Sequence, residues 1–228
     1  MGYLFFVKSP KIISHGPTIG TNTFWSKSGT LTDREVFMAY NINFISRGRA
    51  TVWVGSDYVK LLSPFDPTNS GLERLASGTE HRWNSTGFEL ISGPQKRFTY
   101  SLSGRFGGYF AEGERYNLRS ELGYRFQPYV AITLSSDYND IRMPAPWNRV
   151  QFWLVGPRVD VTFRNNLFLT TFLQYNNQAQ NVNLNTRLQW RYKPASDLFI
   201  VYTDNYLPEN FSVKTRAVVL KFTYWWNP

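Results

Sequence analysis

Residues 181–193 read NVNLNTRLQWRYK, and this stretch decides the fold class. Its alternate positions separate into an apolar and a polar set. The apolar set runs Val182, Leu184, Thr186, Leu188, Trp190 and Tyr192. The polar set runs Asn183, Asn185, Arg187, Gln189, Arg191 and Lys193. Because a β-strand shows successive side chains to opposite faces, the stretch predicts a strand that separates an apolar environment from a polar one.

The same period of two recurs along most of the chain, whereas helical spacing fails nearly everywhere. The segments that carry it are 15–27, 34–46, 50–62, 80–92, 97–111, 116–127, 130–143, 150–163, 167–180, 181–193, 198–208 and 212–226. They predict an all-β chain of about twelve strands, with a partial strand at 3–13. Pro157 predicts a bulge or a local distortion inside its segment, because proline cannot donate to the ladder.

Short and long connections alternate along these strands. The short links are 47–49, 93–96, 127–129, 164–166 and 193–197, and the longer links are 63–79, 112–115, 140–149 and 205–214. One end of the sheet therefore carries short turns, and the other end carries longer loops. Bacterial outer-membrane barrels have this asymmetry, with tight periplasmic turns and longer outer loops.

Composition excludes several classes of protein. The chain has 228 residues, 25 Lys+Arg against 16 Asp+Glu, a formal charge of +9 and 18% aromatic residues. Such an aromatic content argues against disorder, and the absence of cysteine excludes disulfide scaffolds and thiolate metal sites. No apolar run is long enough for a transmembrane helix. Residues 1–8 lack a basic n-region and a small-residue cleavage site, so we expect no signal peptide there.

Strand length and aromatic placement indicate that the apolar face contacts lipid. Soluble strands are most often about 5–6 residues long, whereas a tilted membrane-crossing strand needs about 9–11. Aromatic rings gather at the ends of the apolar sets, where the interfaces of a membrane would lie. The predicted lipid-facing girdle comprises Tyr116, Tyr124, Phe126, Tyr138, Trp190, Tyr192, Tyr224 and Trp226.

The opposite face carries charged residues that we interpret as the lining of a lumen. They are Arg105, Arg119, Glu121, Arg125, Asp137, Arg158, Asp160, Arg187, Arg191 and Lys221. We expect them to form a cross-strand network, whose excess of positive charge favours anions in any water path. Four aromatic residues, Phe37, Trp53, Phe168 and Phe172, share this face and are expected to narrow the bore.

These patterns predict a transmembrane antiparallel up-and-down β-barrel of about twelve strands, complete or part of a larger barrel. Residues 15–228 form the barrel, and residues 1–14 form a lead-in or partial strand. The predicted location is the bacterial outer membrane.

Several stretches resemble landmarks of one protein family. They are Ser63–Thr68, Glu80–Asn84, Ser136–Ile141, Leu167–Leu169, Leu173–Asn176, Trp190–Pro194 and Ser196–Tyr202. Together they resemble the C-terminal barrel region, a domain of unknown function, of large outer-membrane proteins from Bacteroidota and related phyla. Longer members carry an N-terminal module similar to family-9 carbohydrate-binding domains. The resemblance implies a location and an architecture, and it supplies no catalytic residues.

The chain lacks that N-terminal module, so we expect either a C-terminal fragment or a short relative that closes by itself. An open sheet in lipid would leave backbone groups unsatisfied at both edges. The predicted function is a membrane anchor or partner-binding barrel, or a narrow substrate-specific channel, with the first slightly favoured. The predicted partners are outer-membrane lipid and lipopolysaccharide, and other outer-membrane subunits through the 63–79 loop or the edge strands. We predict no enzymatic activity, no cofactor, no metal and no nucleic acid.

Alternative functions rest on few residues. An outer-membrane hydrolase would need Ser14 with His15, or His81 with Ser85, arranged as a nucleophile and its base. A soluble carbohydrate-binding domain would stack sugars on Trp25, Trp83 and Trp147. A calcium site at Asp137, Asn139 and Asp140 matches no complete binding loop. The arginines alternate with lipid-type residues, so no continuous nucleic-acid-binding face forms.

Overall fold

The computed structural model describes residues 1–71 and 73–226. Residues 72, 227 and 228 of the predicted barrel domain lie outside the described residues. The described chain is all-β apart from one short 3-10 turn, η1 (Phe110–Glu112). No helix among these residues has the length and apolarity that would let it span a membrane.

The strands and their bounds are as follows: β1 (Phe5–Phe6), β2 (Ile12–Trp25), β3 (Leu31–Phe44), β4 (Arg49–Lys60), β5 (Glu80–Ile91), β6 (Phe98–Gly108), β7 (Glu114–Phe126), β8 (Val130–Arg142), β9 (Arg149–Arg164), β10 (Leu167–Asn176), β11 (Asn181–Lys193), β12 (Ser196–Tyr206) and β13 (Val213–Phe222).

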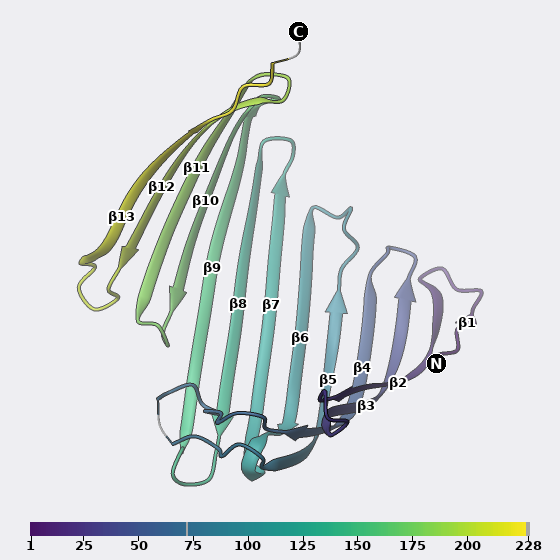
Figure 1. The fold of residues 1–228 in the computed structure, drawn as a ribbon. Coiled ribbons are helices and arrows are strands. Elements are labelled where there is room, and N and C mark those ends of the chain that lie inside the picture. Colours follow the sequence, from purple (N-terminus) through teal and green to yellow (C-terminus); the bar gives the residue numbers. More distant parts are fainter. Residues whose placement is uncertain (72, 227–228) are drawn as a thin grey trace. The chain divides into compact units, whose positions relative to one another are not determined.

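The thirteen described strands follow one another across a single sheet in chain order (Figure 1). Neighbouring strands pair antiparallel, as in β2–β3, β4–β5 and β11–β12. The prediction of an all-β, antiparallel up-and-down fold is therefore confirmed. The twelve predicted segments correspond to β2–β13, and the partial strand expected at 3–13 is the two-residue β1.

The alternation of short and long connections holds for most of the sheet; the exception is 92–97 between β5 and β6, which is no shorter than 109–113 between β6 and β7. Only two residues separate β9 from β10 and β11 from β12, whereas residues 61–79 connect β4 to β5. We call the edge of the sheet with the longer connections the loop end, and the opposite edge the turn end. In an up-and-down sheet, alternate connections lie at the same edge.

Of the two outcomes predicted for Pro157, a bulge or a local distortion, the structure has a local distortion and no bulge. Arg158 pairs with Phe172 and Val155 with Tyr175 in the same register, so the ladder between β9 and β10 is interrupted at Pro157 without a shift. The register shift falls instead between Leu167 and Phe168. A missing N–H removes a ladder bond, but it does not by itself insert an extra residue into the strand.

The chain divides into two compact units, which are described separately. The first unit comprises residues 1–95, 101–119 and 138–151, and the second unit comprises residues 96–100, 120–137 and 152–228. The buried apolar side chains among the described residues are Tyr58, Leu61, Leu75, Phe110, Ile141, Met143 and Val182. All except Val182 belong to the first unit, where they lie near its loop end.

Many large apolar side chains of the strands are exposed. The exposed fraction is 40% for Leu118, 41% for Leu134 and 68% for Leu220. Water-soluble sheet proteins bury such residues against a second layer. Here these leucines of the apolar face are exposed and no second layer among the described residues covers them.

Candidate functional site

The polar face of the second unit is defined by the strand register. Thr170 lies opposite Asp160 on β9 and Arg187 on β11, so the three side chains share a face. Phe172 in the same way lies opposite Arg158 and Asn185. Period-two alternation therefore brings the predicted lining residues of three strands together.

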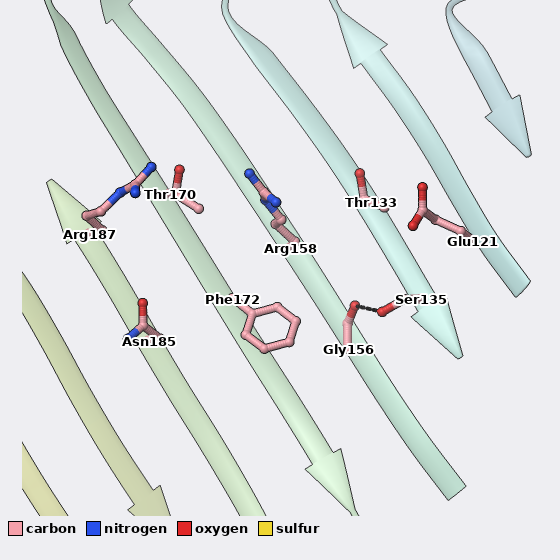
Figure 2. A pocket seen from close by; sticks show the side chains of 9 residues that line it. All are labelled: Glu121, Thr133, Ser135, Gly156, Arg158, Thr170, Phe172, Asn185 and Arg187. Atoms are coloured by element: carbon pink, nitrogen blue, oxygen red, sulfur yellow. Dashed lines mark hydrogen bonds between the residues drawn. The ribbon is translucent and has the colours of Figure 1, made fainter. Parts of the chain in front are cut away.

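A pocket of about 520 Å³ opens on this face (Figure 2). Its lining residues are Glu121, Thr133, Ser135, Gly156, Arg158, Thr170, Phe172, Asn185 and Arg187, from β7 to β11. Seven of the nine lining residues carry a hydroxyl, amide, carboxylate or guanidinium group, and Phe172 is the one aromatic residue. The Ser135 hydroxyl donates to the Gly156 carbonyl at 3.0 Å.

The lining holds two arginines and one glutamate, and Asp160 beside the lining pairs with one of the arginines. Arg158 forms a two-pronged ion pair with Asp160, at 2.9 Å for both contacts, and Thr170 donates to the same carboxylate at 2.8 Å. Within the described part of the chain, Arg187 and Glu121 have no ion-pair partner. The guanidinium of Arg187 therefore keeps its donors available to a ligand or to water.

The other predicted lining residues occupy the same set of alternate positions. Arg119, Glu121 and Arg125 alternate along β7, and Asp137 follows Thr133 and Ser135 along β8. Arg191 lies 3.5 Å from Asp197, to which Gln189 also donates. Lys221 lies opposite Phe199, which lies opposite Gln189.

A second polar cluster lies in the first unit. Arg105 pairs with Asp57 at 2.9 Å and lies 5.9 Å from the ring centre of Trp53. Arg49 pairs with Glu89 at 2.5 Å. A cavity of about 390 Å³ is lined by Thr18, Glu35, Phe37, Ala39, Asn41, Arg49, Thr51, Trp53, Glu89 and Arg105.

Two of the aromatic residues expected to narrow the bore, Phe37 and Trp53, lie across glycines of neighbouring strands. A Cβ added to Gly20 would lie 2.4 Å from the Phe37 ring, and one added to Gly87 would lie 2.5 Å from the Trp53 ring. A ring that covers a strand glycine lies along the sheet wall. Both rings are on the predicted polar face. Because they lie along the sheet, they would narrow the expected lumen less than rings that stand perpendicular to it.

Aromatic residues of the predicted girdle lie on the apolar face near the strand ends. At the turn end of the second unit, Tyr192 stacks on Phe222 with ring centres 5.4 Å apart, and Trp190 lies 6.0 Å from Tyr192. The further ring pairs are Tyr124 with Phe126 and Tyr224 with Trp226. Near the loop end of the first unit, Tyr116 and Tyr138 occupy the corresponding positions of β7 and β8.

An aromatic cap occupies the loop end of the first unit. We use this name for Phe65, His81, Trp83, Tyr109 and Phe110. Phe110 lies 4.9 Å from Phe65, 5.3 Å from His81 and 4.7 Å from Trp83, between ring centres. Burial raises the pKa of the Tyr109 hydroxyl, which lies beside Phe110. The described part of the 63–79 loop therefore packs on its own chain, through Phe65.

Neither histidine contacts a serine. His15 Nδ1 lies 2.6 Å from the Tyr40 hydroxyl, and Ser14 points to the opposite face because the two residues are consecutive in β2. His81 Nδ1 accepts from the Ala111 N–H, and its Nε2 lies 2.9 Å from the Thr79 hydroxyl. A serine–histidine pair of the kind a hydrolase needs is not assembled among the described residues.

The three tryptophans considered for sugar stacking lie in different environments. Trp25 is exposed at the end of β2, whereas Trp83 packs in the aromatic cap. Trp147 donates its indole N–H to the Glu73 carbonyl. These contacts do not bring the three rings into one sugar-binding platform.

The three residues considered for calcium are divided between the two faces. Asp140 is next to Asn139 in β8, so its side chain points to the face opposite Asp137 and Asn139. Arg115 occupies the Asn139 side-chain oxygen with two hydrogen bonds. Within residues 1–71 and 73–226, no group of three or more potential ligands gathers as a metal site would require.

Comparisons with known proteins give a likeness of fold alone. No family model and no curated protein sequence matches this chain. Among solved structures, "KdgM porin in complex with disordered oligogalacturonate" matches with a TM-score of 0.36 and 7% sequence identity. The match covers 94% of this chain and 99% of that chain. The resemblance to Bacteroidota barrels stays a prediction.

Proposed function

We propose that the chain forms an outer-membrane β-barrel with a narrow, water-filled passage that favours anions. One observation carries the proposal: the same strands expose a row of leucines on one face and a row of arginines on the other. A closed barrel in lipid gives each row the solvent it requires. A sheet in water would leave the leucine row exposed, and each Å² of apolar surface left in water costs about 25 cal/mol of free energy.

The preference for anions rests on the predicted lining as a whole, in which six arginines and Lys221 stand against Glu121, Asp137 and Asp160. Arg187 has no ion-pair partner among the described residues, and Arg158 shares one carboxylate with Thr170. Guanidinium groups bind carboxylates and phosphates through paired hydrogen bonds. Small anions or acidic solutes are therefore the substrate class that this lining fits.

Planar-bilayer recordings under a salt gradient test this proposal. The wild-type protein is expected to pass current with a reversal potential that indicates anion preference. The double variant Arg158→Gln/Arg187→Gln removes the two cations and is expected to shift the potential toward no preference. Arg82→Gln removes an arginine from the opposite face and is the matched control, expected to leave the potential unchanged. Cation preference in the wild type would contradict the proposal.

A membrane anchor without a continuous passage is the second candidate, and the aromatic cap favours it. Phe65 and Phe110 fill the loop end of the first unit beside Trp83, which lies on the polar face of β5. Liposome swelling with small sugars and small anions separates the two candidates. Swelling would exclude the hypothesis of an anchor without a passage. No swelling with correctly inserted protein would favour that hypothesis.

A further inference from the structure

A pair of arginines lies on the apolar face of the first unit, where hydrocarbon-facing residues are expected. Asp140 and Arg142 occupy alternate positions at the end of β8, and Arg149 begins β9. Arg142 lies over the Tyr116 ring at 5.0 Å, and Tyr116 alternates with the exposed Leu118 along β7. The cluster therefore adjoins the apolar face and not the polar one.

One buried carboxylate fixes both guanidinium groups. Asp140, whose side chain is 5% exposed, accepts from Arg149 Nε and Nη2 at 2.8 Å each and from Arg142 Nη2 at 3.1 Å. The two arginine side chains remain 54% and 50% exposed. Each guanidinium has five N–H donors, so most of these donors face away from Asp140. The result is a preorganised pair with more donors than its own carboxylate can accept.

The surroundings hold the pair in place and add one further charge. The Met143 N–H donates to the Asn148 carbonyl at 3.0 Å and closes the connection between the two strands. Glu114 accepts a hydrogen bond from the Tyr116 hydroxyl at 3.1 Å, and it bonds to neither arginine. Glu114 is thus a nearby negative charge that opposes an anionic ligand.

The length of β8 places this cluster at the level of lipid head groups. The strand has 13 residues, which span about 43 Å at about 3.3 Å per residue. A tilt of about 40° reduces this to about 33 Å, which exceeds an apolar band of about 25 Å. The final residues of β8 then lie beyond the hydrocarbon, on the side of the longer loops.

We propose that Arg142 and Arg149 bind the phosphate of a membrane lipid head group at the outer edge of the barrel. Phosphate offers several acceptor oxygens in the geometry that guanidinium groups match. Lipid is the source because the donors border the surface that would contact acyl chains. The inference rests on the proposed membrane location, and it adds a lipid site on the outer face of the barrel.

Calorimetric titration of the full chain, folded in detergent micelles, tests the site. The probes are short-chain phosphatidic acid, phosphatidylcholine of the same chain length and inorganic phosphate. We expect saturable binding of phosphatidic acid, weakened about tenfold to a hundredfold by Arg142→Gln/Arg149→Gln. The control Arg82→Gln removes another arginine near the loop end, stacked on Tyr58, and should leave the affinity unchanged.

A second variant keeps the test decisive if the double variant does not fold. Glu114→Gln removes the opposing charge and is expected to tighten phosphatidic acid binding about two- to fivefold. Unchanged affinity in either variant overturns the site, and inorganic phosphate binding as tightly as phosphatidic acid overturns its assignment to lipid. Failure of the wild type to insert into vesicles would remove the proposed function and this site together. Insertion with unaltered affinity in the variants would remove the site alone.

Discussion

The Phe37 ring that covers Gly20 makes a specific energetic prediction. Gly20 in β2 and Phe37 in β3 are direct cross-strand partners. A Cβ at Gly20 would lie 2.4 Å from Phe37 Cζ and 2.6 Å from Cε1, whereas carbon atoms at rest are about 3.5 Å apart. Gly20→Ala must therefore move the ring by about 1 Å. We expect an overpacking cost of about 1–3 kcal/mol, partly offset by about 0.5–1 kcal/mol because alanine suits a strand better than glycine.

A double-mutant cycle isolates the steric part of this cost. In a Phe37→Ala background the added methyl group meets no ring, so Gly20→Ala should be neutral or stabilising. The backbone contribution cancels in the cycle, which leaves a coupling free energy of about 1–3 kcal/mol. The assay is reversible urea unfolding of micelle-folded protein, followed by tryptophan fluorescence.

Gly55 offers a matched control for this cycle, because it is the other cross-strand partner of Phe37. A Cβ at Gly55 would find its nearest atoms at 3.6 Å, an ordinary contact distance. Gly55→Ala should therefore stabilise by about 0.5–1 kcal/mol. A coupling between Gly20→Ala and Phe37→Ala below about 0.5 kcal/mol would refute the reasoning.

Three further predictions concern the loop end. Burial opposes ionisation of the Asp66 carboxyl, but hydrogen bonds from Thr68 and Gly71 outweigh it and lower the pKa of Asp66 below 3.8. The ionised carboxylate therefore stabilises the 61–79 loop above about pH 4. Pepsin cleavage of this loop should rise as the pH falls below that value, and Asp66→Asn should remove this pH dependence. Phe110→Ala removes the centre of the aromatic cap and should cost about 3–5 kcal/mol in urea unfolding; a loss below about 1 kcal/mol would mean that the cap is not packed. Asp204 accepts from Arg216 at 2.7 Å and from two tyrosine hydroxyls, so Asp204→Ala should speed hydrogen exchange in β13, and unchanged exchange would count against the contact.

Strand positions could be predicted from the sequence because each strand separates two environments. The 181–193 segment was predicted with the bounds that β11 has, and its alternation places Arg187 and Leu188 on opposite faces. The same alternation separates Asp140 from Asp137 and Asn139, which is a reason against a shared calcium site beyond the mismatch of loop spacing. Local periodicity is sufficient for these conclusions, since it requires no knowledge of which strands pair.

Contacts between distant segments could not be predicted in the same way. The approach of Phe65 to Phe110 depends on the path of a long loop, and no local pattern specifies that path. The cover of Gly20 by Phe37 depends on the register of β2 against β3, which a turn of uncertain length leaves open. The Asp140 cluster joins the end of β8 to the start of β9, so the periodicity of a single strand does not indicate it.

The most direct test of the account asks which solvent touches each face of a strand. The chain has no cysteine, so single substitutions Arg187→Cys, Leu188→Cys, Leu134→Cys and Ser135→Cys can each carry a spin label in protein reconstituted into lipid bilayers. The account predicts that labels at 134 and 188 are relaxed mainly by lipid-soluble oxygen, and labels at 135 and 187 mainly by a water-soluble nickel chelate. Leucine-site labels that respond to the nickel chelate as strongly as their neighbours would contradict it.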